Sequence, residues 1–210
     1  MRSLALALLV LASCTAVPAQ QKHATYLALG DSYTIGESVP ANERFPMQLA
    51  KTMNLGEPRI IAKTGWTTDE LNAAIDAANV TGTYDLVTLL IGVNNQYRGR
   101  DAEQYRGEFR ALLQRAIGFA GGDPKKVIVV SIPDWGVTPF AEGRDRAKIA
   151  NEIDRYNAIN QEEAQRAGAT YVDITPISRG NDPSLVANDG LHPSGKQYGA
   201  WVKRIAPAAR

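Results

Sequence analysis

Residues 86–91 read Leu-Val-Thr-Leu-Leu-Ile, and this apolar run is the clearest strand signal in the chain. Continuous apolar runs, as opposed to alternating ones, are typical of parallel strands that are covered on both faces. Further short apolar runs lie on either side of it, two before and two after. The five runs therefore predict a buried parallel sheet of five strands; the other four occupy residues 26–29, 59–62, 127–132 and 170–174.

Helical patterns fill the gaps between these runs. Residues 67–70 read Thr-Thr-Asp-Glu, a capping box that predicts the start of a helix reaching about Ala78. Apolar residues recur at helical spacing in two further segments, and the second of these helices is expected to stop at Gly168. The alternation of strand and helix predicts an α/β fold with helices on both faces of the sheet. The other expected helices lie near residues 46–53, 105–117, 149–167 and 194–204.

Length and composition favour one globular domain. The chain has 210 residues, of which 44% are hydrophobic, and it carries 23 basic and 22 acidic residues. A chain of this length suits a single domain, and its composition allows a real core. The near-neutral charge lacks the basic footprint of nucleic-acid-binding proteins, so we expect no nucleic-acid partner.

The N-terminus has the pattern of an export signal. Arg2 precedes an apolar run at residues 4–12, which is too short to span a bilayer but fits a secretory leader. Residues 11–14, Leu-Ala-Ser-Cys, resemble the lipobox of bacterial lipoproteins and would place a lipid on Cys14. Cleavage after residues 17–19, Val-Pro-Ala, is the alternative. We therefore predict a leader and linker over residues 1–20 and a single domain over residues 21–210. We expect the protein to be exported, either as a periplasmic or outer-membrane lipoprotein or as a secreted protein.

Two short polar segments at opposite ends of the chain carry chemically capable residues. Residues 30–34 read Gly-Asp-Ser-Tyr-Thr and follow the first predicted strand, while residues 189–194 read Asp-Gly-Leu-His-Pro-Ser. The chain has only two histidines. His23 lies just before the first strand, which leaves His192 as the candidate base for Ser32.

These residues can form a nucleophilic triad. A serine hydroxyl is a poor nucleophile at neutral pH until a nearby base takes its proton. His192 can do this for Ser32 if a carboxylate fixes its tautomer, and Asp189, three residues away, can supply that carboxylate. The competing interpretation of the first segment is an ordinary turn at a strand end, with Asp31 or Ser32 capping a helix.

Four segments in order resemble the blocks of the SGNH or GDSL hydrolase family. They carry Ser32, Gly65 in Lys-Thr-Gly-Trp, Asn94 in Gly-Val-Asn-Asn, and His192. The resemblance implies a three-layer, flavodoxin-like α/β/α fold and a serine esterase that needs no cofactor. It also implies that the backbone N–H groups of Ser32 and Gly65 and the side-chain amide of Asn94 form an oxyanion hole. Asp189 would orient His192.

One position departs from this pattern, and three aromatic residues are candidates for contact with the substrate. Asn95 occupies a position where many members of the family carry aspartate; since the donor role belongs to Asn94, we expect activity to survive. Trp66, Trp135 and Tyr97 lie beside predicted strand ends and are candidate substrate-binding residues. Aromatic packing beneath a loop is the alternative interpretation of the two tryptophans.

The sequence as a whole predicts an exported serine esterase. We expect it to hydrolyse carboxylic esters through an acyl-serine intermediate, with a short-acyl or O-acetyl substrate favoured. One alternative is a thioesterase or lysophospholipase that acts on longer chains, and another is a noncatalytic lipoprotein that binds the envelope. Two distant histidines and no cysteine cluster give no credible metal site. We expect a monomer whose partner is a small-molecule, lipid or acetylated-glycan ester, with membrane contact only through a lipid anchor.

Overall fold

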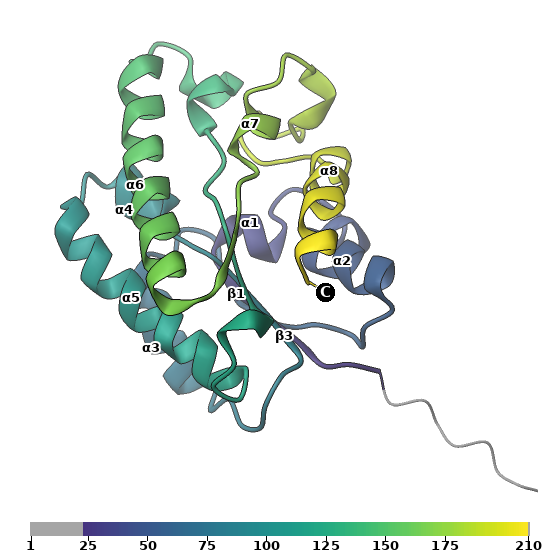
Figure 1. Ribbon diagram of the computed structural model, residues 1–210. Helices are drawn as coiled ribbons and strands as arrows, with labels where there is room; N and C mark the ends of the chain where they lie inside the picture. The colour runs from purple at the N-terminus through teal and green to yellow at the C-terminus, as the bar shows by residue number, and fades with distance from the viewer. Residues whose placement is uncertain (1–22, 210) are drawn as a thin grey trace, which may run out of the picture.

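A computed structural model describes residues 23–209 (Figure 1). Its centre is a five-stranded parallel sheet in the order β2-β1-β3-β4-β5. The predicted fold class and the five parallel strands are confirmed. The predicted leader and Cys14 lie outside the described residues. The strands are β1 (Tyr26–Gly30), β2 (Arg59–Ala62), β3 (Leu86–Leu90), β4 (Val127–Val130) and β5 (Thr170–Val172).

The three middle strands explain the continuous apolar runs. Every residue of β1, β3 and β4 is buried, because helices cover both faces of the sheet. Strand β4 is two residues shorter than its apolar run at 127–132. The reason is that the main-chain N–H and C=O of Ile132 pair with the side chain of Asn157, so the chain leaves the sheet there.

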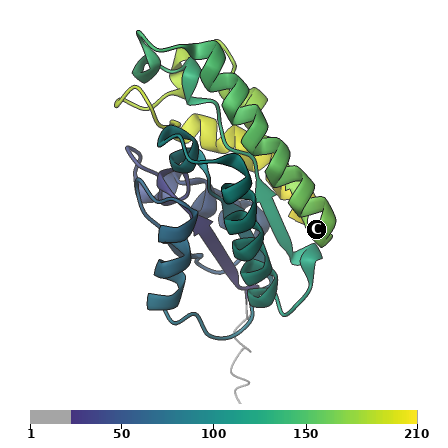
Figure 2. The same ribbon diagram turned by 90° about the vertical axis from the view of Figure 1, so that its left-hand side faces the viewer.

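Helices form the two outer layers. The helices α3 (Thr68–Ala77), α5 (Ala102–Phe119) and α6 (Arg146–Ala167) lie on one side of the sheet in Figure 1, and α2 (Phe45–Met53) and α8 (Gly195–Ile205) lie on the other. Figure 2 is seen from the side of α3, α5 and α6.

Two of the predicted helix ends are confirmed by their hydrogen bonds and dihedral angles. At the start of α3 the capping box is complete, and the N–H of Thr67 donates to a carboxylate oxygen of Glu70 over 2.9 Å. Helix α6 ends at Gly168, whose φ of 76° lies in the left-handed region that glycine adopts without strain.

Short helices follow several strands directly, and the sequence did not predict most of them. Fewer than two turns give no recognisable helical period, so such elements escape pattern analysis. They are functionally placed, because they stand at the carboxyl edge of the sheet. They are α1 (Ser32–Ile35), α4 (Val93–Tyr97) and α7 (Thr175–Ser178), and single 3₁₀ turns lie at Ala41–Glu43, Pro124–Lys126, Trp135–Val137, Pro139–Ala141, Pro183–Leu185 and Ala206–Ala209.

Candidate active site

Ser32 is the first residue of α1, immediately beyond β1. Asp31 caps this helix by accepting the N–H of Tyr33 over 3.0 Å. A side chain at Gly30 would lie 2.1 Å from Oγ1 of Thr34 and 2.4 Å from the carbonyl oxygen of Leu90, so only glycine fits there. The sharp strand-to-helix turn thus fixes the backbone of Ser32. As the first helical residue, its N–H has no acceptor within the helix.

The loop before α8 brings a histidine and a carboxylate to the same place. Nδ1 of His192 lies 2.6 Å from Oδ2 of Asp189, and the His192 ring is nearly buried. The loop is closed by the N–H of Ala187, which donates to the carbonyl of His192 over 2.7 Å, and by a bridge between Val186 and Pro193. The predicted pairing of Asp189 with His192 is therefore present in the structure.

Asp189 has a donor for each of its lone-pair directions. Oδ1 accepts the N–H groups of Leu191 and His192 over 3.0 Å each, while Oδ2 accepts the Ser38 hydroxyl over 2.6 Å and faces His192. Partial burial alone would raise the pKa of Asp189, but these hydrogen bonds, led by that from Ser38, hold it well below its usual range. The carboxylate is thus ionised beside the imidazole at neutral pH.

The other two predicted oxyanion donors, Gly65 and Asn94, come from segments that follow β2 and β3, the strands on either side of β1. Gly65 follows β2 and has a φ of 87°, in the left-handed region. Asn94 lies in α4, beyond β3, and its side-chain amide donates to the carbonyl of Trp66 over 2.9 Å. A carboxamide nitrogen has two hydrogens, so this bond orients Asn94 and leaves one hydrogen for a ligand.

One cavity of about 170 Å³ joins these residues. Ser32, His192, Gly65 and Asn94 all line it, although they come from four separate parts of the chain. Trp66 is not among the lining residues; its side chain is partly buried against the core. The rest of the lining is mainly apolar and consists of Tyr33, Thr64, Val93, Tyr97, Trp135, Phe140 and Leu191.

Three aromatic rings form one wall of this cavity. The Trp135 ring lies 5.4 Å from that of Tyr97 and 5.9 Å from that of Phe140, measured between centroids. The guanidinium of Arg144 stands 5.1–5.4 Å from all three ring centres, within cation–π range. Tyr97 is 48% exposed and Phe140 is 41% exposed, so this aromatic wall continues from the cavity to the surface.

A buried acid lies directly beside the nucleophile. Asp31 has no exposed surface, and its second carboxyl oxygen has no hydrogen-bond partner among residues 23–209. Burial raises the pKa of Asp31 to about 7, against the opposing effect of the Tyr33 N–H. Because Asp31 is fully buried and its carboxylate caps α1, we assign it a structural role in this helix.

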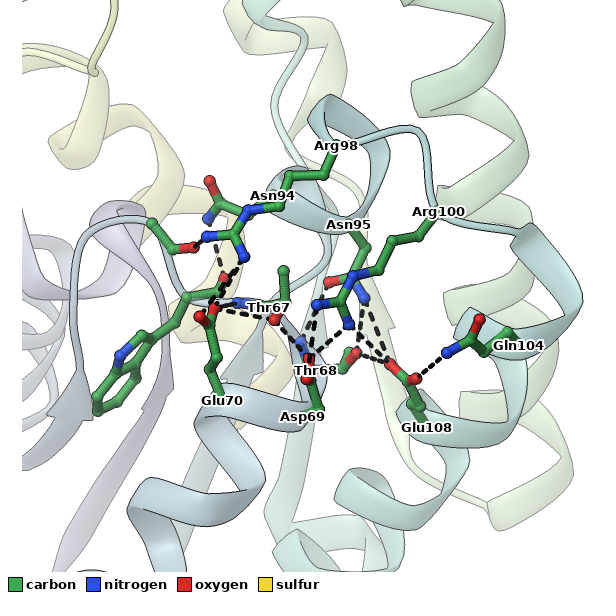
Figure 3. Close-up of polar contacts among 12 residues, drawn as sticks. Thr67, Thr68, Asp69, Glu70, Asn94, Asn95, Arg98, Arg100, Gln104 and Glu108 are labelled. Carbon is green, nitrogen blue, oxygen red and sulfur yellow. Dashed lines mark hydrogen bonds and ion pairs between the residues drawn. The ribbon is translucent and has the colours of Figure 1, made fainter.

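Asn95 lies in a buried polar cluster on the other side of α4 (Figure 3). Its carbonyl oxygen accepts the N–H of Thr68 over 3.1 Å, and its amide nitrogen donates to Oγ1 of Thr68 over 2.7 Å. The same nitrogen lies 3.4 Å from a carboxylate oxygen of Glu108, which also accepts the Thr68 hydroxyl. Asn95 thus acts as donor and acceptor at once, which an ionised aspartate cannot do.

Sequence reasoning missed Ser38 as part of this site. Ser38 is an exposed loop residue with a φ of 64°, and its hydroxyl contacts Asp189, which is 151 positions away in the chain. No local pattern marks such a residue. His23, in contrast, is exposed and within hydrogen-bond distance of the carbonyl of Asn54, away from the cavity lining.

The part of the chain that the structure describes has neither a cluster of metal-ligating side chains nor a helix that could span a membrane. Over residues 23–209, no group of three or more His, Cys, Asp or Glu side chains is arranged to hold a metal ion. Within the same residues, every helix is too short or too polar to cross a bilayer.

Comparisons with solved structures agree with the fold. An acetylxylan esterase from Geobacillus stearothermophilus is 19% identical, with a TM-score of 0.67 over 89% of this chain and 94% of its own. A phospholipase A1 from Streptomyces albidoflavus is 18% identical, with a TM-score of 0.68 over 89% of this chain and 98% of its own. The esterase EstA from a Pseudoalteromonas species, inhibited by monoethylphosphonate, is 15% identical, with a TM-score of 0.62 over 88% and 95%.

The sequence itself identifies the family. No curated protein matches the chain. A family model, that of the GDSL-like lipase/acylhydrolase family, matches residues 28–200, which include Ser32, Gly65, Asn94 and His192. The resemblance predicted from the four blocks is thereby confirmed. The chain belongs to the GDSL-like lipase/acylhydrolase family and is an ester hydrolase.

Proposed function

We propose that the protein is an exported serine esterase that works through an acyl-Ser32 intermediate. The observation that carries this proposal is the meeting of Ser32, His192, Gly65 and Asn94 in one cavity, with Asp189 2.6 Å from the His192 ring. Membership in an ester-hydrolysing family favours this function over that of a noncatalytic envelope-binding lipoprotein.

The chemistry follows from these positions. Asp189 accepts Nδ1–H of His192, which leaves Nε2 free to take the proton of Ser32 as its oxygen attacks the ester carbonyl. The resulting oxyanion receives hydrogen bonds from the N–H groups of Ser32 and Gly65 and from the free amide hydrogen of Asn94. His192 then gives the proton to the leaving alcohol oxygen. A water molecule repeats the sequence on the acyl-enzyme and releases the acid.

The size of the cavity supports a short acyl group. Its volume of about 170 Å³ is below the roughly 300–1,000 Å³ of sites that enclose a drug-sized ligand. An acetyl or similarly short acyl group fits this space, and the alcohol part of the ester can then extend out of the mouth. We therefore favour short-acyl or O-acetyl esters; the neighbour described as an acetylxylan esterase is consistent with this choice.

The exported location rests on the sequence of the N-terminus. The apolar run at residues 4–12 and the placement of Cys14 favour a leader and a lipid anchor, with simple secretion as the alternative. An ester outside the cytoplasm, such as an acetylated glycan, is then the natural class of substrate.

A second function is favoured by one specific observation. The exposed rings of Tyr97 and Phe140 continue the apolar lining out to the surface, where a long acyl chain could lie against them. A thioesterase or lysophospholipase of the same mechanism would use this surface. The structural neighbour described as a phospholipase A1 is consistent with that alternative.

A series of p-nitrophenyl esters from acetyl to palmitoyl tests both functions on the purified protein, with Ser32→Ala as the control. We expect hydrolysis that favours the short esters and is lost in the control. Turnover that rises steeply toward octanoyl and palmitoyl would establish the second function. Turnover unchanged in Ser32→Ala would refute the proposed chemistry.

A further inference from the structure

The side chains of Asn94 in α4 and of Arg98 just after it, both labelled in Figure 3, hold the loop that carries Gly65. Arg98, which directly follows α4, donates from Nη2 to the carbonyl of Gly65 over 2.7 Å. Asn94, one turn earlier in α4, donates to the next carbonyl of the loop, that of Trp66, over 2.9 Å. The carbonyls of two consecutive loop residues are therefore held by α4 and by the residue that follows it.

Gly65 needs such an anchor more than any other residue would. Its φ of 87° is one that glycine adopts freely, and glycine has no Cβ whose contacts would restrict rotation of the adjoining peptide groups. The N–H and the carbonyl of Gly65 belong to successive peptide groups, whose relative orientation is set by the φ and ψ angles of Gly65. A hydrogen bond that fixes the carbonyl leaves the direction of the N–H dependent on these two angles alone.

The other terminal nitrogen of Arg98 connects the same guanidinium to α3. Nη1 lies 3.4 Å from a carboxylate oxygen of Glu70, and Glu70 accepts the N–H of Thr67 over 2.9 Å. Arg98 and Glu70 are both over 40% exposed, so this ion pair contributes little to stability. The arrangement is better suited to orientation, because the planar guanidinium donates along fixed directions to two neighbouring groups.

We propose that Arg98 is a positioning residue for the oxyanion hole, which acts by holding the Gly65 carbonyl and thereby the backbone on which the preceding peptide group directs the Gly65 N–H at the developing oxyanion. This inference rests on the proposed serine-esterase function. Arg98 touches no reacting atom in that scheme; it acts through Gly65, and its loss would weaken transition-state stabilisation more than substrate binding.

Arg100 provides a matched control. It leaves the same segment two residues later and pairs with Asp69 over 2.6 Å and with Glu108 over 3.8 Å. It has the same charge and a comparable ion-pair environment. Within the described contacts it has no bond to residues 64–66.

The experiment compares Arg98→Gln, Arg98→Lys and Arg100→Gln with the unmodified protein, using p-nitrophenyl acetate and a p-nitrophenyl phosphonate. For Arg98→Gln we expect kcat to fall by about 10-fold to 10²-fold, which is at or below the fall in kcat that follows the removal of one oxyanion donor. KM should change by less than about 2-fold. The rate of phosphonylation should fall in parallel. Arg98→Lys should recover part of kcat, and Arg100→Gln should stay within about 2-fold of the unmodified protein.

Each other outcome has a definite meaning. Equal kcat values for Arg98→Gln and Arg100→Gln, or a change confined to KM or to the melting temperature, would overturn the positioning role. If Arg98→Gln does not fold, Arg98→Lys is compared with Arg100→Gln in its place. Full activity and unchanged phosphonylation of both variants would then contradict the need for a planar donor at position 98. Hydrolysis that survives Ser32→Ala would instead refute the underlying function, which distinguishes the two failures.

Discussion

Oγ of Ser38 lies 2.6 Å from Oδ2 of Asp189, the same carboxylate oxygen that faces the imidazole of His192. The hydroxyl therefore completes the set of donors around the predicted triad acid. Ser38 holds a left-handed φ of 64°, which is uncommon outside glycine, asparagine and aspartate. A residue kept in a disfavoured conformation while it contacts the carboxylate of the proposed triad indicates a role in positioning that carboxylate.

Ser38→Ala should lower kcat by about 10-fold, because a hydrogen bond to a charged group is worth roughly 1.5–3 kcal/mol and part of that loss reaches the transition state. The hydrogen bonds that lower the pKa of Asp189 stabilise the fold in full above the unfolded pKa near 4, and this stability is lost as pH falls through the lower folded pKa. The unfolded pKa is the same in both proteins, so the stability gap between the variant and the unmodified protein should stay constant from neutral pH to about pH 4 and close below it. Urea unfolding from pH 7 to pH 2 measures this gap; a gap that does not close below pH 4 would contradict this account.

Asn95→Asp should destabilise the protein, even though many members of the family carry aspartate there. The change would remove both amide donors and place a carboxylate within about 3.4 Å of the Glu108 carboxylate in a buried cluster. We expect a loss of about 1–3 kcal/mol in the free energy of unfolding. Chemical denaturation measures this loss.

Glu108→Gln supplies the control for that variant. Combined with Asn95→Asp, it removes the facing charge and should recover part of the lost stability, so the two changes should not be additive. Additive losses, or an Asn95→Asp protein as stable as the unmodified one, would show that the two side chains do not interact as the structure places them.

Asp31 should make the fold less stable as pH rises. Its pKa of about 7 lies above the unfolded value near 4, so the folded state binds its proton more tightly than the unfolded state. Stability from this proton is complete below about pH 4 and is lost progressively up to about pH 7. Asp31→Asn keeps a helix-capping oxygen but has no ionisable proton. Its advantage in unfolding free energy should grow between pH 4 and pH 7, and parallel pH curves for the two proteins would refute the raised pKa.

Phe140→Ala tests the aromatic wall. If acyl chains lie along it, kcat/KM should fall more for the octanoyl ester than for the acetyl ester, by about 10-fold, since burying a large apolar side chain is worth roughly 1.5–3 kcal/mol. Val137→Ala is the control, because Val137 is similarly exposed but does not line the cavity. An equal fall in kcat/KM for both esters would show that long acyl chains do not bind along the aromatic wall.

The strands and the site edge were predictable because their signals are local. Buried parallel strands must be continuously apolar, and residues that follow such strands must gather at one edge, so Ser32, Gly65 and Asn94 could be placed together from the sequence. Short helices such as α4 could not be predicted, since one turn has no period. The partners of Asn95 and Ser38 were also out of reach, because Glu108 and Asp189 meet them only through the folded chain.

Covalent labelling of Ser32 tests the central claim most directly. The protein would be treated with a p-nitrophenyl ethylphosphonate and its intact mass measured, followed by peptide mapping. The account predicts one adduct, located on Ser32, with a matching loss of ester hydrolysis. Ser32→Ala should not be labelled, and His192→Ala should be labelled much more slowly than the unmodified protein. A folded protein that hydrolyses esters without labelling at Ser32, or that is labelled equally well without His192, would contradict it.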